Sequence, residues 1–305
     1  MRSHDESFRS NESFKPVRGG KRRFDDEETF SKRGQRQHLE TVEDTPEDGA
    51  RWSTWDQSTP TERGPLPHPD WLVTELAAVD IELGMLKTGK EADVFLVERG
   101  VPDTDRRCIL AAKRYRASEH RMFHRDAGYL EGRRVKESRT NRAMASRTAF
   151  GKEVIAGQWA ASEFAALSRL YTMGVPVPYP VQILGTEVLL EFIGDGSVAA
   201  PRLAQFRQET ADLPDLWRQL VSALSLMARA GWAHGDLSAY NLLVHNGRLV
   251  VIDLPQIVDV VANPQGKQFL LRDAHNVATW FQSHGVPEAD GDTLAADLCL
   301  EAGLR

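Results

Sequence analysis

The stretch HGDLSAYNLLVHNGRLVVIDLP, residues 234–255, spaces oxygen-bearing side chains in a way that suits metal and phosphate chemistry. Asp236 follows an apolar segment and precedes a strand-like run, where a carboxylate can take or orient the proton of an attacking hydroxyl. Asn241 follows with an amide oxygen, a hard neutral ligand suited to Mg²⁺. Two short apolar runs joined by Asn-Gly, a typical type I′ hairpin turn, then end at Asp253. The hairpin would fold Asp253 back toward Asn241.

This order of residues follows the H-x-D-L-x-x-x-N pattern of protein-kinase catalytic loops, which have a second metal-binding Asp beyond a hairpin. Four positions match the pattern: His234, Asp236, Leu237 and Asn241. Gly235 replaces the usual Arg, and Leu254-Pro255 replaces the usual Phe-Gly. The alternative interpretation, a surface loop with ordinary turn-forming residues, does not account for the joint spacing of the ligands.

A kinase also needs a cation for the phosphates, and Lys113 is the candidate. It lies in the middle of the apolar run ILAAKRY, where a lysine either reaches solvent or points at phosphates beside a carboxylate. The helix predicted downstream offers Glu153 and Glu163, and we favour Glu163 because its neighbours are apolar. The sequence therefore predicts an ion pair between Lys113 and Glu163.

The segment KTGKEADV, residues 87–94, takes the place of a glycine-rich phosphate loop but matches it poorly. Lys87 and Ala92 replace the outer glycines, and only Gly89 agrees with the pattern. A backbone turn at Gly89 could still approach phosphate, with the Thr88 hydroxyl and the Lys90 ammonium adding contacts.

The elements that position these residues follow from hydrophobic periodicity. We predict strands in IELGMLKT, DVFLVER and RCILAAKRYR, a helix over 148–173, a hairpin around Gly185, and a helix in DLWRQLVSALSLMARAG. Two further helices are predicted around 264–284 and 288–303. The expected fold class is α+β, with a strand-rich part over 69–193 and a helix-rich part over 194–305.

Two segments stand apart from this pattern. Residues 1–68 are polar and charged, so we predict a disordered tail. Within it, Trp52 and Trp55 mark either a docking motif or, as we favour, part of a solvated linker. Residues 116–148 are rich in Arg and are predicted to be a basic flexible loop.

The composition of the 305-residue chain is that of an ordinary soluble globular protein, with 41% hydrophobic and 27% charged residues. The net charge of −6 argues against a chain covered in positive charge for nucleic acid, although local basic patches remain compatible with it. Two cysteines imply no disulfide framework and fit a cytoplasmic location. The sequence has no apolar run long enough for a membrane helix and no secretory signal at its start.

Taken together, these motifs resemble the RIO family of atypical serine/threonine protein kinases, and within it the type-one branch. The segments that carry the resemblance, in chain order, are TGKEADV, AAKRYR, WAASEFAAL, VPVPYP, LLEFIG, HGDLSAYNLLV and VIDLPQ. The resemblance covers about residues 80–284 and implies a two-lobed protein-kinase-like fold with a strand-rich N-lobe and a small helical C-lobe. It also implies ATP as substrate, with Mg²⁺ or Mn²⁺.

The resemblance implies a role for each matching position. Asp236 would be the catalytic base or orienting group, and Asn241 and Asp253 would hold the metal ion. Lys113, fixed by Glu163, would hold the α- and β-phosphates. The remaining nucleotide contacts would come from Thr88, Gly89 and Lys90 over the triphosphate and from backbone groups of Glu191 and Ile193 at the adenine. Asp253 is also a position that could accept phosphate, as in aspartyl-phosphate ATPases.

The physiological partner stays open at this point. The basic loop 116–148 could bind RNA or a ribosomal particle, or supply Ser138 or Ser146 for autophosphorylation. One alternative is a small-molecule phosphotransferase of the aminoglycoside or choline kinase type, which also uses H-G-D and an Asn five residues later. Another is an assembly factor that uses ATP as a switch on a ribonucleoprotein.

Overall fold

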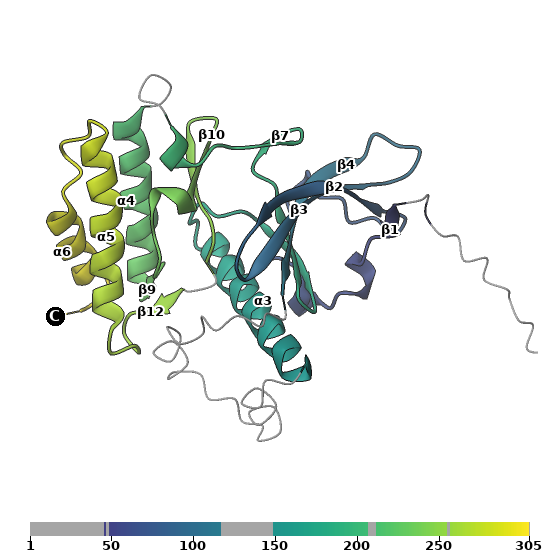
Figure 1. Ribbon diagram of the computed structural model, residues 1–305, viewed down its shortest axis with the longest axis horizontal. Helices are drawn as coiled ribbons and strands as arrows, with labels where there is room; N and C mark the ends of the chain where they lie inside the picture. The colour runs from purple at the N-terminus through teal and green to yellow at the C-terminus, as the bar shows by residue number, and fades with distance from the viewer. Residues whose placement is uncertain (1–45, 47–48, 117–148, 207–211, 255–256, 305) are drawn as a thin grey trace, which may run out of the picture. The chain divides into compact units, whose positions relative to one another are not determined.

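Strands fill the first part of the chain and helices the last part (Figure 1). The computed structural model describes residue 46 and residues 49–116, 149–206, 212–254 and 257–304. A six-stranded antiparallel sheet has the strand order β1-β2-β3-β4-β6-β5. Its strands are β1 (Ala50–Trp52), β2 (Val79–Thr88), β3 (Ala92–Gly100), β4 (Arg107–Tyr115), β5 (Pro180–Leu184) and β6 (Glu187–Glu191). The strands predicted from periodicity are therefore confirmed.

The register of the sheet decides which side chains reach the candidate site. Lys87 of β2 lies opposite Val94 of β3, which lies opposite Lys113 of β4. Residues directly opposite one another share a face of the sheet, and successive residues alternate between faces. Lys87 and Lys113 therefore share one face, and Leu110 and Ala112 lie on the other, packed in a buried cluster.

The long helix α3 (Ala149–Thr172) packs against β4, β5 and β6. Its buried residues Ala156, Ala160 and Phe164 join Tyr115 and Val188 of the sheet in one apolar cluster. Gly174 follows the helix with a φ of 80°, a conformation that glycine adopts without steric cost. The helix predicted over 148–173 is confirmed, and its packing fixes the side of the helix that bears Glu163.

The prediction that residues 1–68 form a disordered tail is wrong for residues 49–68. β1 pairs with β2, and two short 3₁₀ helices follow, η1 (Trp55–Gln57) and η2 (Pro60–Glu62). Trp55 is only 5% exposed and packs in the sheet's core, so it belongs neither to a docking motif nor to a solvated linker. Residues 1–45 and 47–48 lie outside the described residues.

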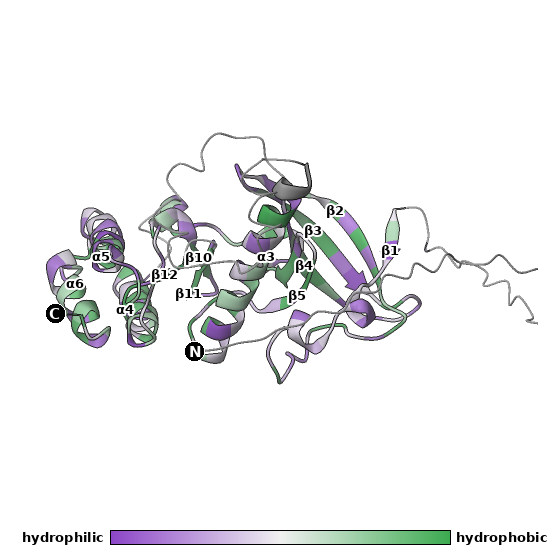
Figure 2. Ribbon diagram, turned by 90° about the horizontal axis from the view of Figure 1, so that it is seen from below, coloured by the Kyte–Doolittle hydropathy of each residue, from purple (hydrophilic) through white to green (hydrophobic). Residues whose placement is uncertain are grey.

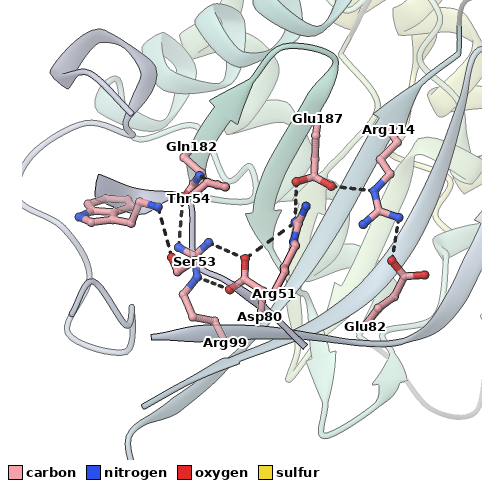
Figure 3. Close-up of polar contacts among 10 residues, drawn as sticks. Arg51, Ser53, Thr54, Asp80, Glu82, Arg99, Arg114, Gln182 and Glu187 are labelled. Atoms are coloured by element: carbon pink, nitrogen blue, oxygen red, sulfur yellow. Dashed lines mark hydrogen bonds and ion pairs between the residues drawn. The ribbon is translucent and has the colours of Figure 1, made fainter. Parts of the chain in front are cut away.

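A buried polar network ties this N-terminal segment to the sheet (Figure 3). Arg99 is fully buried and donates two hydrogen bonds to the Asp80 carboxylate, at 2.7 and 3.0 Å. It donates a third to Gln182, whose amide donates in turn to Thr54. Because a buried charge is costly unless it is paired and hydrogen-bonded, these contacts hold β2, β3, β5 and the segment just after β1 in one arrangement.

The last part of the chain is built from helices around two small hairpins. Its elements are β7 (Gly194–Asp195), β8 (Val198–Ala199), η4 (Leu203–Gln205), α4 (Leu213–Arg229), β9 (Trp232–Ala233), η5 (Ala239–Asn241), β10 (Leu242–His245), β11 (Arg248–Val251), β12 (Val258–Asp259), α5 (Gly266–Ser283) and α6 (Gly291–Glu301). Figure 2 shows apolar and polar residues mixed along α4, α5 and α6, as expected of helices with one buried face. The predicted α+β class with a strand-rich and a helix-rich part is confirmed. No helix in the described ranges is long and apolar enough to cross a lipid bilayer.

Candidate active site

In the loop between β9 and η5, Asp236 is exposed to solvent, and side chains of α5 bind the backbone on both sides of it. Asp273 of α5, only 3% exposed, accepts hydrogen bonds from the backbone N–H groups of Gly235 and Leu237, at 2.7 and 3.0 Å. The side chain of Asn276 donates to the carbonyl oxygen of Leu237. These contacts on both sides of Asp236 fix its position relative to α5.

Asp273 is a residue of the candidate site that the sequence reasoning missed. Burial raises the pKa of its carboxyl, and the two backbone donors, with His234 and Arg272 nearby, act in the opposite direction. The available signal was its place on the apolar stripe of α5, which also carries Leu270, Ala274 and Val277. A lone carboxylate on such a stripe needs partners, because burying an unpaired charge is costly.

The hairpin β10–β11 brings Asn241 and Asp253 to the same end, as predicted. Asn246 and Gly247 have φ values of 51° and 72°, which a type I′ turn requires. At the end of the hairpin opposite the turn, Ile252 N–H donates to the carbonyl oxygen of Asn241 at 2.9 Å. Asp253 therefore lies one residue beyond the last hydrogen bond between the two strands. The Asn241 amide NH₂ donates to the backbone carbonyl of Asp236 at 2.8 Å, so the loop that carries Asp236 is held against the metal-ligand candidate Asn241.

Asp253 has a φ of 66°, in the left-handed region that L-residues other than Asn and Asp seldom adopt. This conformation costs of the order of 1 kcal/mol and turns the chain sharply after β11. The carboxylate of Asp253 accepts a hydrogen bond from Lys113 Nζ at 3.0 Å, on a strand 140 residues away in sequence. The turn thus aims the carboxylate at the face of the sheet that carries Lys113.

Lys113 lies between two carboxylates. Its Nζ lies 2.6 Å from Glu163 Oε1 and 3.0 Å from Asp253 Oδ1. The Glu163 side chain is only 2% exposed, and its other oxygen accepts a hydrogen bond from the Tyr115 hydroxyl. The predicted pair of Lys113 with Glu163 is present, and Glu153 of the same helix is exposed.

The charges of these three residues favour the charged forms of Lys113 and Asp253. Burial disfavours the Lys113 ammonium, but Glu163 and Asp253 outweigh it and raise the pKa of Lys113 above its usual range. Burial likewise opposes ionisation of Asp253, but Lys113 outweighs it and holds the pKa of Asp253 below its usual range. The Lys113 ammonium and the Asp253 carboxylate therefore each favour the charged form of the other.

The loop between β2 and β3 meets its predicted role only in part. Gly89 N–H donates to the carbonyl of Ala92, and a Cβ on Gly89 would lie 3.0 Å from that oxygen, so the turn is tight. Lys90 is exposed at the tip. Thr88 lies opposite Asp93, on the face away from Lys113, so strand register does not support phosphate contact by its hydroxyl.

The predicted adenine contacts lie at the end of β6. Glu191 N–H donates to the carbonyl of Tyr179, and the Glu191 carboxylate accepts from the Tyr179 N–H. Ile193 follows and its carbonyl accepts from Ala200 N–H beside the β7–β8 hairpin. These two hydrogen bonds with Tyr179 fix the end of β6, after which the chain continues into the helical part.

The donor set fits a hard divalent cation such as Mg²⁺. Asp253 supplies a carboxylate and Asn241 an amide oxygen, and Mg²⁺ prefers oxygen ligands with substrate phosphates completing its shell. The described ranges hold no group of three or more His, Cys, Asp or Glu side chains arranged for a metal. Two protein ligands plus phosphates is the arrangement that these residues allow.

Comparison with known proteins adds the deciding observation. A protein-family model of the RIO domain matches residues 99–294, more than half of the chain. The chain belongs to the RIO family. The RIO family and the kinase-like fold predicted from the motifs are thereby confirmed.

Curated relatives in the RIO family are serine/threonine-protein kinases by name. The chain is 38% identical over 218 residues to the RIO-type serine/threonine-protein kinase Rio1 of Haloferax volcanii, covering 71% of this chain and 68% of the relative. It is 32% identical over 213 residues to the serine/threonine-protein kinase RIO1 of Chaetomium thermophilum, covering 67% and 40%. The bovine serine/threonine-protein kinase RIO3 is 30% identical over 216 residues, covering 68% and 40%. The chain thus matches less than half of the longer relatives.

Among solved structures, the chain is similar to the Rio2 kinase of Chaetomium thermophilum in its complex with ADP, Mg²⁺ and phosphoaspartate. The TM-score is 0.48 at 18% identity, covering 71% of this chain and 62% of that one. The curated names favour a serine/threonine protein kinase over the small-molecule phosphotransferase alternative.

Proposed function

We propose that this RIO-family chain transfers the γ-phosphate of ATP to a serine or threonine hydroxyl, including hydroxyls of its own chain. The observation that carries the proposal is the placement of Lys113 between Glu163 and Asp253, beside the loop that presents Asp236. This arrangement supplies a cation for phosphates, a ligand pair for a metal ion and a carboxylate for the acceptor hydroxyl.

Each residue has one task in this account. Lys113 is held by Glu163 and binds the phosphates. When the nucleotide enters, its phosphates replace Asp253 as the partner of the Lys113 ammonium. Asn241 and Asp253 hold Mg²⁺ or Mn²⁺, which when bound offsets the negative charge of the phosphates. Asp236 orients the acceptor hydroxyl and takes its proton, while Glu191 and Ile193 bind the adenine through backbone groups. Gly89 and Lys90, with the backbone of Thr88, cover the phosphates.

The test is the affinity for ATP in the presence and absence of Mg²⁺, measured by titration calorimetry on Asp253→Ala. We expect the Mg²⁺-supported affinity to fall more than tenfold, over ~1.4 kcal/mol, because a ligand carboxylate is lost. Asp259→Ala, a carboxylate on β12 whose contacts are to its own loop, is the matched control. Unchanged Mg²⁺-dependent binding in Asp253→Ala refutes the metal assignment.

The products of incubation with labelled ATP separate the possible acceptors. A phosphate on Ser or Thr is stable in acid, whereas an acyl phosphate on Asp253 is cleaved by hydroxylamine. A segment that directly follows β4 in the sequence is tethered to the site, and short tethers give effective concentrations in the millimolar range. We therefore expect modification within residues 116–148, at Ser138 or Ser146, a segment of which 117–148 lies outside the described residues. Phosphate only within residues 1–68 contradicts this assignment.

A second role, as an ATP-dependent switch on a ribonucleoprotein, stays a prediction. Its support is the Arg-rich sequence of residues 116–148, the segment proposed to bind RNA or a ribosomal particle. Contacts with the phosphate backbone release counterions, so RNA affinity should fall steeply as salt rises. A flat salt dependence excludes such contacts.

A further inference from the structure

We propose that Lys87 and Arg202 form a cationic clamp beside Lys113 and Asp253, where both bind the phosphate chain of the nucleotide. The proposal rests on the proposed function, because it assigns two further ligand-binding residues to the same site. It makes affinity for ATP and ADP depend on cations besides Lys113, while affinity for the nucleoside part stays independent of them.

One residue of the clamp is Lys87, on β2 of the sheet. The register of β2, β3 and β4 sets Lys87, Val94 and Lys113 in one row on one face of the sheet. Neighbouring strands lie roughly 4.8 Å apart, so the Cα atoms of Lys87 and Lys113 lie about 10 Å apart, with the two side chains on the same side. A register shift between Met85 and Lys87 gives Lys87 this orientation. A lysine thus stands where a glycine-rich loop has its first glycine, and it adds a charge to that position.

The other residue of the clamp is Arg202, which lies beside the metal-ligand candidate Asn241. It makes an isolated β-bridge with Leu243, the residue two beyond Asn241, and its guanidinium donates to the carbonyl oxygen of Tyr240. Tyr240 immediately precedes Asn241 in η5. Arg202 is therefore fixed beside the metal-ligand candidate, and the donors of its fork that do not reach Tyr240 are suited to a phosphate oxygen.

Lys87 and Arg202 are cations additional to the group of Lys113, Glu163 and Asp253, and the two interact electrostatically with each other near that group. Lys113 is balanced by Glu163, and the carboxylate of Asp253 is shared with Lys113. The side chain of Lys87 is exposed, but desolvation and repulsion by Arg202 and Lys113 lower its pKa, against the attraction of Asp253. Lys87 of the sheet therefore interacts electrostatically with Arg202, which lies beside Asn241, as well as with Lys113 and Asp253. Like charges gathered around one carboxylate are unfavourable alone and become favourable when a polyanion lies between them.

The experiment measures the dissociation constants of ATP, ADP and adenosine by competition in the presence of Mg²⁺. The variants are Lys87→Ala, Arg202→Ala and the double substitution in the full chain. Arg218→Ala is the control for net charge, because Arg218 is an exposed residue of α4 that pairs with Asp215 of the same helix. Thermal melts verify that each variant is folded.

We expect ATP and ADP to bind about tenfold more weakly to each single variant, as is typical when one charge-assisted hydrogen bond is lost. Adenosine affinity should stay within about twofold of the unmodified chain, and Arg218→Ala should change neither. An equal loss for ATP and adenosine shows that Arg202 only braces Tyr240 and overturns the clamp, as does an unchanged ATP affinity. Failure of the unmodified chain to bind ATP at all instead overturns the proposed function.

Discussion

At the scale of single residues, the site depends on one ammonium shared by two carboxylates. The sequence motifs predicted Lys113, Glu163, Asp236, Asn241 and Asp253 because their spacing is local or repeats a known pattern. The contact between Lys113 and Asp253, 140 residues apart, has no signal in local sequence and follows only from the fold. Asp273 had a local signal in its place on the apolar stripe of α5, but its partners, backbone N–H groups of a distant loop, follow only from the fold.

The ion pair of Lys113 and Glu163 has both a structural and a functional consequence, and a double variant separates them. Lys113→Met leaves Glu163 buried without its cation, and we expect a loss of about 2 kcal/mol in the free energy of unfolding. Lys113→Met with Glu163→Gln should recover most of this stability, because no buried charge remains unpaired. Chemical denaturation and ATP binding measure the two effects. Recovery of ATP affinity together with stability would show that Lys113 acts only in folding.

At the scale of elements, periodicity predicted the strands β2–β6 and the helices α3–α6, because each carries an apolar pattern of its own. The segment 49–68 lacks such a pattern. It is held by one aromatic residue, by pairing with β2 and by a polar network whose members Thr54, Arg99 and Gln182 are far apart in sequence. Order that depends on partners in other elements cannot be read from the segment itself.

Two neighbouring tryptophans test whether this segment is part of the folded unit. Trp55 is 5% exposed in the core and Trp52 is 43% exposed on β1. Trp55→Ala should lower the free energy of unfolding by about 3 kcal/mol, as in other large-to-small core substitutions, and Trp52→Ala by clearly less. Thermal or denaturant melts of the two variants give the answer. Equal and small effects of both substitutions would instead support the interpretation of this segment as a solvated linker.

The Glu187 carboxylate of β6, which pairs with Arg51 of β1 and Arg114 of β4 (Figure 3), should give the fold a defined acid dependence. Burial opposes ionisation of Glu187, but its bonds with Arg51 and Arg114 outweigh burial and lower its pKa below the ordinary 4.5. A lowered pKa stabilises the fold above the ordinary value, and this contribution is lost as pH falls through the lowered pKa.

Glu187→Gln should therefore destabilise the fold by about 1–2 kcal/mol at pH 7, with the difference shrinking below about pH 4. Thermal melts between about pH 3 and pH 7.5 measure it. Glu75→Gln, which removes an exposed partner of Arg106, is the control and should show little effect. A constant difference at all pH values would mean that the ion pairs of Glu187 contribute nothing.

At the scale of the whole molecule, the proposed function divides the site between two parts: the sheet supplies the phosphate-binding cation, and the helical part supplies the catalytic loop and the metal ligands. The ion pair of Lys113 with Asp253 joins the two parts. The central claim is phosphoryl transfer from ATP with Asp236 as the orienting group, since the other groups bind the nucleotide without acting on the acceptor.

The most direct measurement is the single-turnover rate of autophosphorylation with labelled ATP and Mg²⁺, comparing the unmodified chain with Asp236→Asn. A lost base or orienting group typically lowers the rate by ~10²–10⁴-fold. ATP affinity in the same variant should stay within about twofold, because Asp236 does not hold the nucleotide. A variant that transfers phosphate at the unmodified rate would contradict the account.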